Sequence, residues 1–201
     1  MSQQGSEYSI RDCSRALLAV IEQYETDHDS DRLRNGLLQA ARPLIARPDL
    51  FKLGVKREAN HISNSKWLYY DGRMSVTLDE FPNGKKIPPH DHGIWEALIV
   101  CSGRVSHTVY ERTDDGKVDG HAELRVVEDR VFGPREIAMV VPPAEIHSFT
   151  ALEDRTFVLT VVGGEYKPIR HYYQVEEKTY IVRTPRALRE SGALEAEELI
   201  Q

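Results

Sequence analysis

A series of short β-strand signals begins near Asn64 and limits this chain to few folds. Runs rich in Val, Ile, Thr, Tyr and Phe, among them MSVTLDEF, EALIVC and TFVLTVV, alternate with turn sequences. Asp-Gly at 71–72, Asn-Gly at 83–84 and Ser-Gly at 102–103 are typical of tight turns between such strands. Many short strands at this spacing predict an all-β sandwich or barrel.

The first 50 residues follow a different pattern. Apolar side chains recur at helical spacing over residues 10–24 and again over residues 31–46. Ser9 and Asp31 stand at the positions where N-caps are expected. These residues predict two α-helices in front of the strands.

The chain is predicted to form one structural domain with three parts. The segment from Thr184, which contains RALRESGALEAEEL, is charged and has few large apolar residues, so it predicts a short peripheral helix. The parts are an N-terminal helical segment (1–50) packed on the barrel, a β-domain (51–183) and a helical C-terminal tail (184–201).

Composition and charge exclude several classes of function. The formal net charge of -6 and the lack of a Lys/Arg stripe argue against a nucleic-acid partner. No apolar run approaches the length of a membrane span, and residues 1–9 lack the features of a signal peptide. Cys13 and Cys101 form no CxxC pair and no disulfide framework, which suits a reducing compartment. We therefore expect a cytoplasmic protein without a membrane or nucleic-acid partner.

The stretch from Gly84 to Gly103 carries the strongest functional signal. His90 and His92 are two residues apart, so both imidazoles project from one face of a β-strand. Glu96 follows just before an apolar run, and His147 supplies a distant fourth candidate. Borderline divalent metals accept these nitrogen and oxygen donors. We predict a mononuclear metal site formed by His90, His92, Glu96 and His147.

The remaining histidines are assigned to ordinary surface or hydrogen-bonded positions, because a lone histidine is seldom a ligand. Two of them lie on sequence that predicts an outer hairpin, His107 and His121. The others are His28, His61 and His171.

The metal-site stretch resembles the first motif of the cupin superfamily, G-x5-H-x-H-x3-E-x6-G. The matching residues are Gly84, His90, His92, Glu96 and Gly103. The resemblance covers about residues 67–183 and implies a double-stranded β-helix, the cupin jelly roll. It also implies a divalent metal bound by three histidines and one glutamate.

The second cupin motif, P-x-G-x-x-H-x3-N, is matched in part. Pro142 and His147 are in place, whereas Ala144 stands for the Gly and Ala151 for the Asn. Cupin motifs identify the fold better than the reaction, because one fold hosts many chemistries.

A narrower resemblance comes from PPHDHGIWEALIVCSGRVSHTVYER and VPPAEIHSFTA, with two predicted helices in front. These segments are similar to the cysteine dioxygenase-like branch of the cupins, which includes bacterial 3-mercaptopropionate dioxygenases. The resemblance implies Fe(II) held by His90, His92 and His147, and conversion of a small thiol to a sulfinate with O2. Mn, Ni, Cu and Zn accept the same donors, so they stay open as alternatives. The expected partners are a small-molecule substrate, O2 and a second copy in a homodimer.

Three features depart from that branch. The Cys that cross-links to a Tyr in the animal enzymes aligns with Ala97. The Ser-His-Tyr relay beyond the third histidine falls on Thr160, Val162 and Gly164. The Arg that binds the substrate carboxylate in that branch has no matching position here; Arg73 is nearby, and Arg170 and Arg183 are alternatives.

Glu96 separates the candidate reactions. Three histidines leave three positions open on an octahedral metal, enough for a bidentate substrate and O2, whereas a fourth ligand leaves two. Glu96 also suits a metal-dependent isomerase, lyase or hydrolase, in which it acts as general acid or base. A non-catalytic metal-binding cupin is the third hypothesis.

Two aromatic residues near the predicted site have two interpretations each. Trp95 and Tyr69 either line the substrate pocket, as catalytic candidates beside Glu96 and Arg73, or fill the core. Alternation along the strands gives a further test. If Glu96 faces the barrel interior, Cys101 faces outward, and an interior Arg73 requires Thr77 and Asp79 to face inward as well.

Overall fold

The computed structural model describes residues 8–57 and 64–190. Within them, α1 (Ile10–Asp27), α2 (Ser30–Ile45) and a 3₁₀ turn (Leu50–Lys52) precede the strands, and α3 (Pro185–Glu190) follows them. The strands are β1 (Val55–Lys56), β2 (Asn64–Tyr70), β3 (Ser75–Phe81), β4 (Lys86–His90), β5 (Glu96–Ser102), β6 (Val105–Arg112), β7 (Leu124–Phe132), β8 (Ile137–Val140), β9 (Ile146–Ala151), β10 (Thr156–Val162), β11 (Arg170–Gln174) and β12 (Thr179–Arg183). His61 and the tail beyond α3, residues 191–201, lie outside the described residues.

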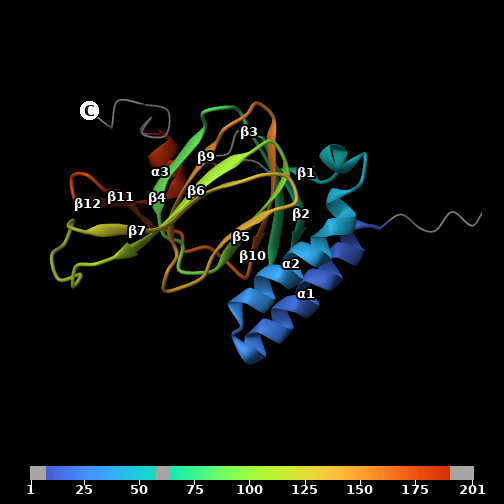
Figure 1. Ribbon diagram of the computed structural model, residues 1–201, viewed down its shortest axis with the longest axis horizontal. Coiled ribbons are helices and arrows are strands. Elements are labelled where there is room, and N and C mark those ends of the chain that lie inside the picture. The colour runs from blue at the N-terminus through green and yellow to red at the C-terminus, as the bar shows by residue number, and fades with distance from the viewer. Residues whose placement is uncertain (1–7, 58–63, 191–201) are drawn as a thin grey trace, which may run out of the picture.

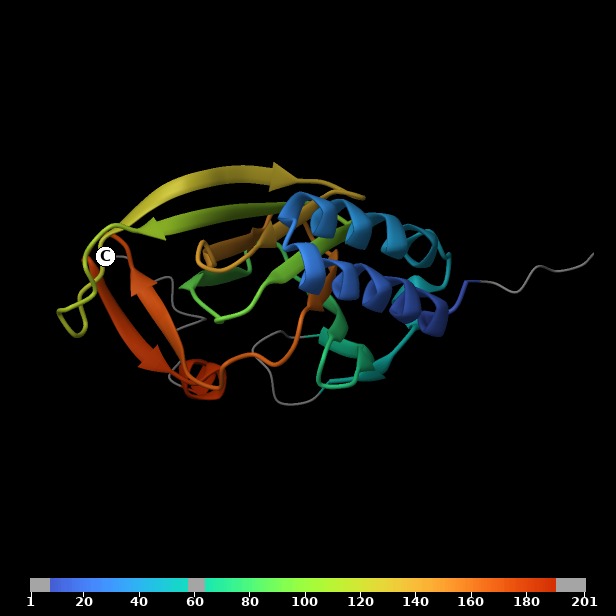
Figure 2. The same ribbon diagram turned by 90° about the horizontal axis from the view of Figure 1, so that it is seen from below.

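The strands form two antiparallel sheets of six strands each (Figures 1 and 2). The order is β1-β2-β3-β10-β5-β8 in the first sheet and β12-β11-β4-β9-β6-β7 in the second. From β3 to β6 the chain alternates between the sheets strand by strand, and it does so again from β8 to β10. This winding is that of a double-stranded β-helix, so the predicted all-β jelly roll is confirmed.

The two predicted N-terminal helices are confirmed, and α1 and α2 lie side by side along one side of the strands (Figure 1). Ser9 caps α1, as expected, through a capping box with Asp12. The predicted cap at Asp31 is wrong, because the N-cap of α2 is Asp29. Its side chain accepts the backbone N–H of Arg32, which leaves Asp31 in the first helical turn. Among the described residues, no helix is long and apolar enough to cross a membrane.

Side-chain alternation along β5 divides the interior into two cores. Ala97 and Ile99 pack with the buried face of α1 and α2, whereas Leu98 and Val100 point between the sheets. Glu96 shares the inner face with Leu98, and Cys101 lies on the helix side, as predicted. The helices therefore cover the outer face of the first sheet and leave its inner face free to form a site.

The prediction that His90 and His92 share one strand is only partly right, because β4 ends at His90, and its Pro88-Pro89 pair removes two backbone donors. The strand nevertheless pairs with β9 at Ile87 and again at His90, with a register shift between these two positions. The prolines sit within this irregular part, where the regular ladder is interrupted. The shift leaves His90 directly opposite His147.

Truncating Leu37 should strongly destabilise the protein. Leu37 in α2 is fully buried in the core between the helices and the first sheet. Leu37→Ala should lower the free energy of unfolding by about 2–5 kcal/mol, because a cavity replaces the lost contacts. Urea unfolding monitored by circular dichroism would measure this change. Gln39→Ala, on the exposed face of the same helix, should stay within about 0.5 kcal/mol of the wild type. Equal effects of both changes would contradict the packing of α2 on the sheet.

Candidate metal centre

Three buried histidines meet at the inner face of the second sheet. His90 ends β4, His92 follows two residues later, and His147 lies in β9 opposite His90. The Nε2 atom of His92 lies 3.0 Å from Nε2 of His90 and 3.0 Å from Nε2 of His147. All three side chains are at most 4% exposed. The predicted convergence of these histidines is thus present in the structure.

The donor set suits a divalent metal ion. Burial lowers the pKa of His90 to about 4 and that of His147 well below its usual range, so both rings are neutral and carry free lone pairs. Two nitrogen donors at right angles, each about 2.1 Å from one ion, are about 3.0 Å apart. The three histidines could therefore bind one metal ion. Within the described residues, they form a group of side chains close enough together to share a metal.

A second layer of contacts orients these rings. His90 Nδ1 is 2.8 Å from the carbonyl oxygen of Pro88, and His147 Nδ1 is 2.7 Å from Nε2 of His107. Asp91, between the two motif histidines, is 2.7 Å from Nδ1 of His171. Such contacts fix which ring nitrogen is free to coordinate.

The sequence prediction for His107 was wrong: it placed this residue at an ordinary position on an outer hairpin, whereas the side chain is buried behind His147. The side chain is 1% exposed, and burial lowers its pKa to about 4. Val105, His107 and Val109 occupy every second position of β6 and are all buried. They therefore share one inward face of the strand. That alternation was present in the sequence and could have identified the residue.

Removing the His107 ring should weaken metal binding without removing a ligand. His107→Gln should raise the metal dissociation constant roughly 10- to 100-fold, because His147 loses the partner that orients it. Competitive titration with a metal chelator would measure the constant. His121→Gln is the matched control and should leave it unchanged, since His121 lies in an isolated bridge away from the cluster. Unaltered affinity in His107→Gln would show that the contact does not position the ligand.

Glu96 faces the cluster from the other sheet. Its carboxylate oxygens lie 3.7 Å from Nε2 of His92 and 3.8 Å from Nε2 of His147. The Tyr166 hydroxyl donates a hydrogen bond to Glu96. Burial raises the pKa of the Glu96 carboxyl to about 7, while the bond from Tyr166 opposes that rise. Glu96 is thus within reach of any group held by the histidines.

A cavity of about 440 Å³ opens beside the cluster, between the sheets. Its polar lining includes His90, His147, Glu96 and Arg170, and its apolar lining includes Phe149. Arg170, in β11, is 6% exposed, and its guanidinium lies 4.4 Å above the ring of Tyr166. Among the described residues, its Nε has no hydrogen-bond partner. A buried guanidinium with an unpartnered Nε in a cavity is suited to an anionic ligand.

The other predicted catalytic residues lie elsewhere. Arg73 stands in the turn before β3 and contacts Glu22 and Glu25 of α1 at 3.4 and 3.3 Å. Thr77 and Asp79 do face inward, but Arg73 precedes the strand and does not follow its alternation.

Two aromatic candidates also lie outside the cavity lining. The Tyr69 hydroxyl donates to Asp71, and its ring packs on the helix-side core. Trp95 is buried in that same core, where the bare Cα of Gly163 makes room for its indole, since a Cβ would come within 2.1 Å. The core-filling interpretation therefore describes both side chains.

Three cavity residues were missed or ranked low from the sequence. Arg170 was only an alternative to Arg73, although it opens a strand whose Tyr172 also faces inward against His90. Tyr166 lies in the loop after β10, where no periodicity reveals which way a side chain points. Asp79 was predicted to face inward only if Arg73 did, and it was given no role, whereas it lines the cavity.

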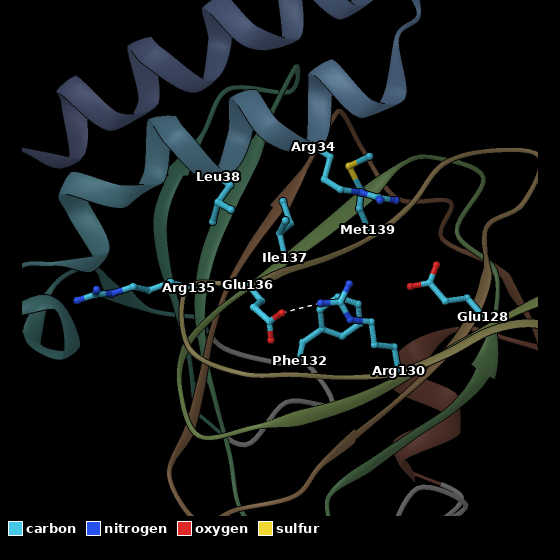
Figure 3. Close-up of a pocket in the computed structure, with 9 residues that line it drawn as sticks. All are labelled: Arg34, Leu38, Glu128, Arg130, Phe132, Arg135, Glu136, Ile137 and Met139. Atoms are coloured by element: carbon cyan, nitrogen blue, oxygen red, sulfur yellow. Dashed lines mark hydrogen bonds and ion pairs between the residues drawn. The ribbon is translucent and has the colours of Figure 1, made fainter.

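A second cavity, of about 200 Å³, lies outside the barrel beside α2 (Figure 3). Leu38, Ile137 and Met139 form its apolar part, and Arg130 pairs with Glu136 at 2.6 Å on its rim. None of the three clustered histidines lines it. The histidine cluster therefore lies at the inner cavity and not at this one.

No protein-family model matches this sequence, and no curated protein matches it significantly. Solved structures with a similar arrangement include a cupin superfamily protein from Desulfitobacterium hafniense DCB-2, with 16% identity and a TM-score of 0.36 over 50% of this chain and 76% of that one. KdgF from Halomonas sp. has 17% identity and a TM-score of 0.41 over 55% and 88% of the two chains. Oxalate decarboxylase OxdC from Bacillus subtilis has 17% identity and a TM-score of 0.40 over 57% and 28%. At these low TM-scores, the assignment of the fold rests on the strand order and register described above.

Proposed function

We propose that this chain is a mononuclear Fe(II)-dependent dioxygenase of the cysteine dioxygenase-like cupin branch, which oxidises a small thiol or a related small metabolite with O2. The observation that carries the proposal is the cluster of three buried histidines at a cavity that also contains Arg170, whose Nε has no hydrogen-bond partner among the described residues. Three neutral ligands leave positions open for substrate and O2. The arginine supplies the charge that holds an acidic substrate in place.

Each cavity residue has a distinct task in this reaction. Arg170 binds the substrate carboxylate through its guanidinium, at a fixed place relative to the histidines. Tyr166 and Glu96, joined by their hydrogen bond, hold a proton beside the reacting group. Phe149 and Leu98 close the apolar side and limit the access of water. The bound iron would bring the substrate together with O2, and both oxygen atoms would enter the substrate.

A second candidate rests on Glu96 itself. A carboxyl group with a pKa of about 7, buried and within 3.8 Å of two histidine nitrogens, is suited to proton transfer at neutral pH. A metal-dependent isomerase, lyase or hydrolase with Glu96 as acid or base would consume no O2. Metal binding without turnover is the third candidate.

Oxygen consumption separates these functions. The protein is loaded anaerobically with Fe(II), mixed with 3-mercaptopropionate, cysteine or cysteamine, and then exposed to O2 in an oxygen electrode. We expect one thiol to stimulate O2 uptake, with formation of the sulfinate detected by mass spectrometry. The folded His90→Ala variant should lose this uptake. Failure of every thiol to stimulate O2 uptake would rule out thiol oxidation and favour the acid–base candidate.

A further inference from the structure

Asp79 is a buried carboxylate on the cavity wall that the proposed reaction does not use. It lies in β3, is 1% exposed, and lines the same cavity as Glu96 and Arg170. Its neighbours Thr77 and Thr160 also line this cavity. A buried acidic group that faces a ligand site is a candidate for recognition or chemistry.

Three hydroxyl groups converge on this carboxylate. Ser65 Oγ donates to Oδ1 at 2.5 Å, and the Oγ1 atoms of Thr77 and Thr160 each donate to Oδ2 at 2.7 Å. A hydroxyl that donates its proton to Asp79 keeps only lone pairs for other partners. Thr77, Thr160 and Asp79 therefore present hydrogen-bond acceptors to the cavity and can bind a donor.

Arg57 favours the ionised form of Asp79 electrostatically but, within the described residues, forms no ion pair with it. Among the ion pairs of residues 8–57 and 64–190, none involves Asp79, and its three hydrogen bonds there come from neutral hydroxyls. Arg57 also lines the cavity, but its guanidinium lies 4.4 Å above the ring of Trp67. Burial raises the pKa of Asp79 despite the three hydroxyls and Arg57, because desolvation penalises the anion. A cationic ligand group would offset that penalty.

The cavity is therefore chemically two-sided. Asp79, Thr77 and Thr160 come from β3 and β10 of the first sheet, whereas Arg170 comes from β11 of the second. The strands β3 and β10 thus offer one set of groups, hydrogen-bond acceptors, and β11 offers another, the guanidinium of Arg170. A ligand with an acidic group alone would satisfy only one of them.

We propose that Asp79, with Thr77 and Thr160, forms a subsite for an ammonium group of the ligand, apart from the histidine cluster. The ligand then carries an acidic group bound by Arg170 and an amino group bound by Asp79. This inference uses one part of the proposed function, namely that the ligand binds in this cavity. It requires neither O2 chemistry nor a particular metal.

A purely structural role for Asp79 predicts a different result. The hydroxyl network joins β2, β3 and β10, so its loss could lower stability without any effect on which ligand is preferred. The informative quantity is therefore the ratio of affinities for two ligands that differ only by an amino group. A general loss of stability does not change that ratio.

The probes are glycine, β-alanine and 4-aminobutyrate, each paired with the carboxylate of equal length: acetate, propionate and butyrate. Calorimetry on the anaerobic Fe(II)-loaded protein measures each dissociation constant. In the wild type, we expect the amino compound of at least one pair to bind roughly 10-fold tighter or more, as for a charged hydrogen bond. Asp79→Asn should reduce that ratio to about one while affinity for the plain carboxylate persists.

Two further variants keep the test informative. Glu80→Gln removes the neighbouring charge from the same strand and should leave the ratio unchanged. Thr160→Val removes one acceptor with little change in shape and should lower the ratio several-fold, which covers the case in which Asp79→Asn does not fold. The proposal is overturned if no amino compound is preferred in the wild type, if no probe binds, or if the folded variants keep the preference. A failure of thiol-dependent O2 uptake would leave these ratios unaffected, so the two proposals fail separately.

Discussion

Replacing His147 with alanine should abolish stable metal binding. His147 is 1% exposed, lies 3.0 Å from His92, and contacts His107 through its other ring nitrogen, so its loss removes one of the three clustered nitrogen donors. Binding at a four-ligand zinc site corresponds to about 10–16 kcal/mol. One ligand therefore contributes roughly 3 kcal/mol, and its loss should weaken binding about 100-fold or more. Metal analysis of the dialysed protein would show the loss.

The control for this change is His28→Asn. His28 is exposed at the end of α1 and has a φ of 52°, a left-handed conformation that asparagine tolerates. Its metal content should match that of the wild type. Full metal content in His147→Ala would contradict the three-histidine site, provided circular dichroism shows an intact fold.

Replacing Arg170 with methionine should weaken the binding of acidic ligands about 10- to 100-fold. The guanidinium is buried on the cavity wall with an unpartnered Nε, and its contact with a ligand anion is not screened by bulk water. Methionine keeps the aliphatic contact with Tyr166 but removes every donor. The measurement is the dissociation constant for propionate, or KM for the thiol that supports turnover.

Arg73→Met tests the alternative assignment that the sequence suggested. Arg73 contacts Glu22 and Glu25 on the outer surface, with about half of its side chain exposed, so ligand binding should not change. A large effect of Arg73→Met, together with none of Arg170→Met, would reverse the assignment of the anion-binding residue. The pair of variants therefore decides which arginine holds the substrate.

The sequence predicted the histidines well because their constraint is local. His90 and His92 are two residues apart, so they stay close together although His92 lies just beyond the end of β4. Alternation also predicted that Glu96 and Leu98 face inward and Cys101 outward. The same rule applied to β6 would have revealed His107 between Val105 and Val109.

Prediction was weakest where the chain leaves a regular strand. Arg73 precedes β3, so the alternation that turns Thr77 and Asp79 inward does not extend to it. Tyr166 lies in a loop, and its approach to Glu96 depends on the path of the chain after β10. The start of α2 was misplaced because two acidic residues, Asp29 and Asp31, both suit an N-cap and only the bond to Arg32 selects one.

By itself, the sequence determined the all-β jelly roll, the two helices in front and the three histidines, because each follows from periodicity or fixed spacing along the chain. Only the tertiary structure decided which residues share the cavity with them. Arg170 and Asp79 lie 91 positions apart and come from different sheets. Their placement in one cavity depends on how the sheets pack, and no local pattern in a single sequence encodes that contact. The sequence motif thus predicts the histidine cluster, whereas Arg170 and Asp79 reach the same cavity only through the packing of the two sheets.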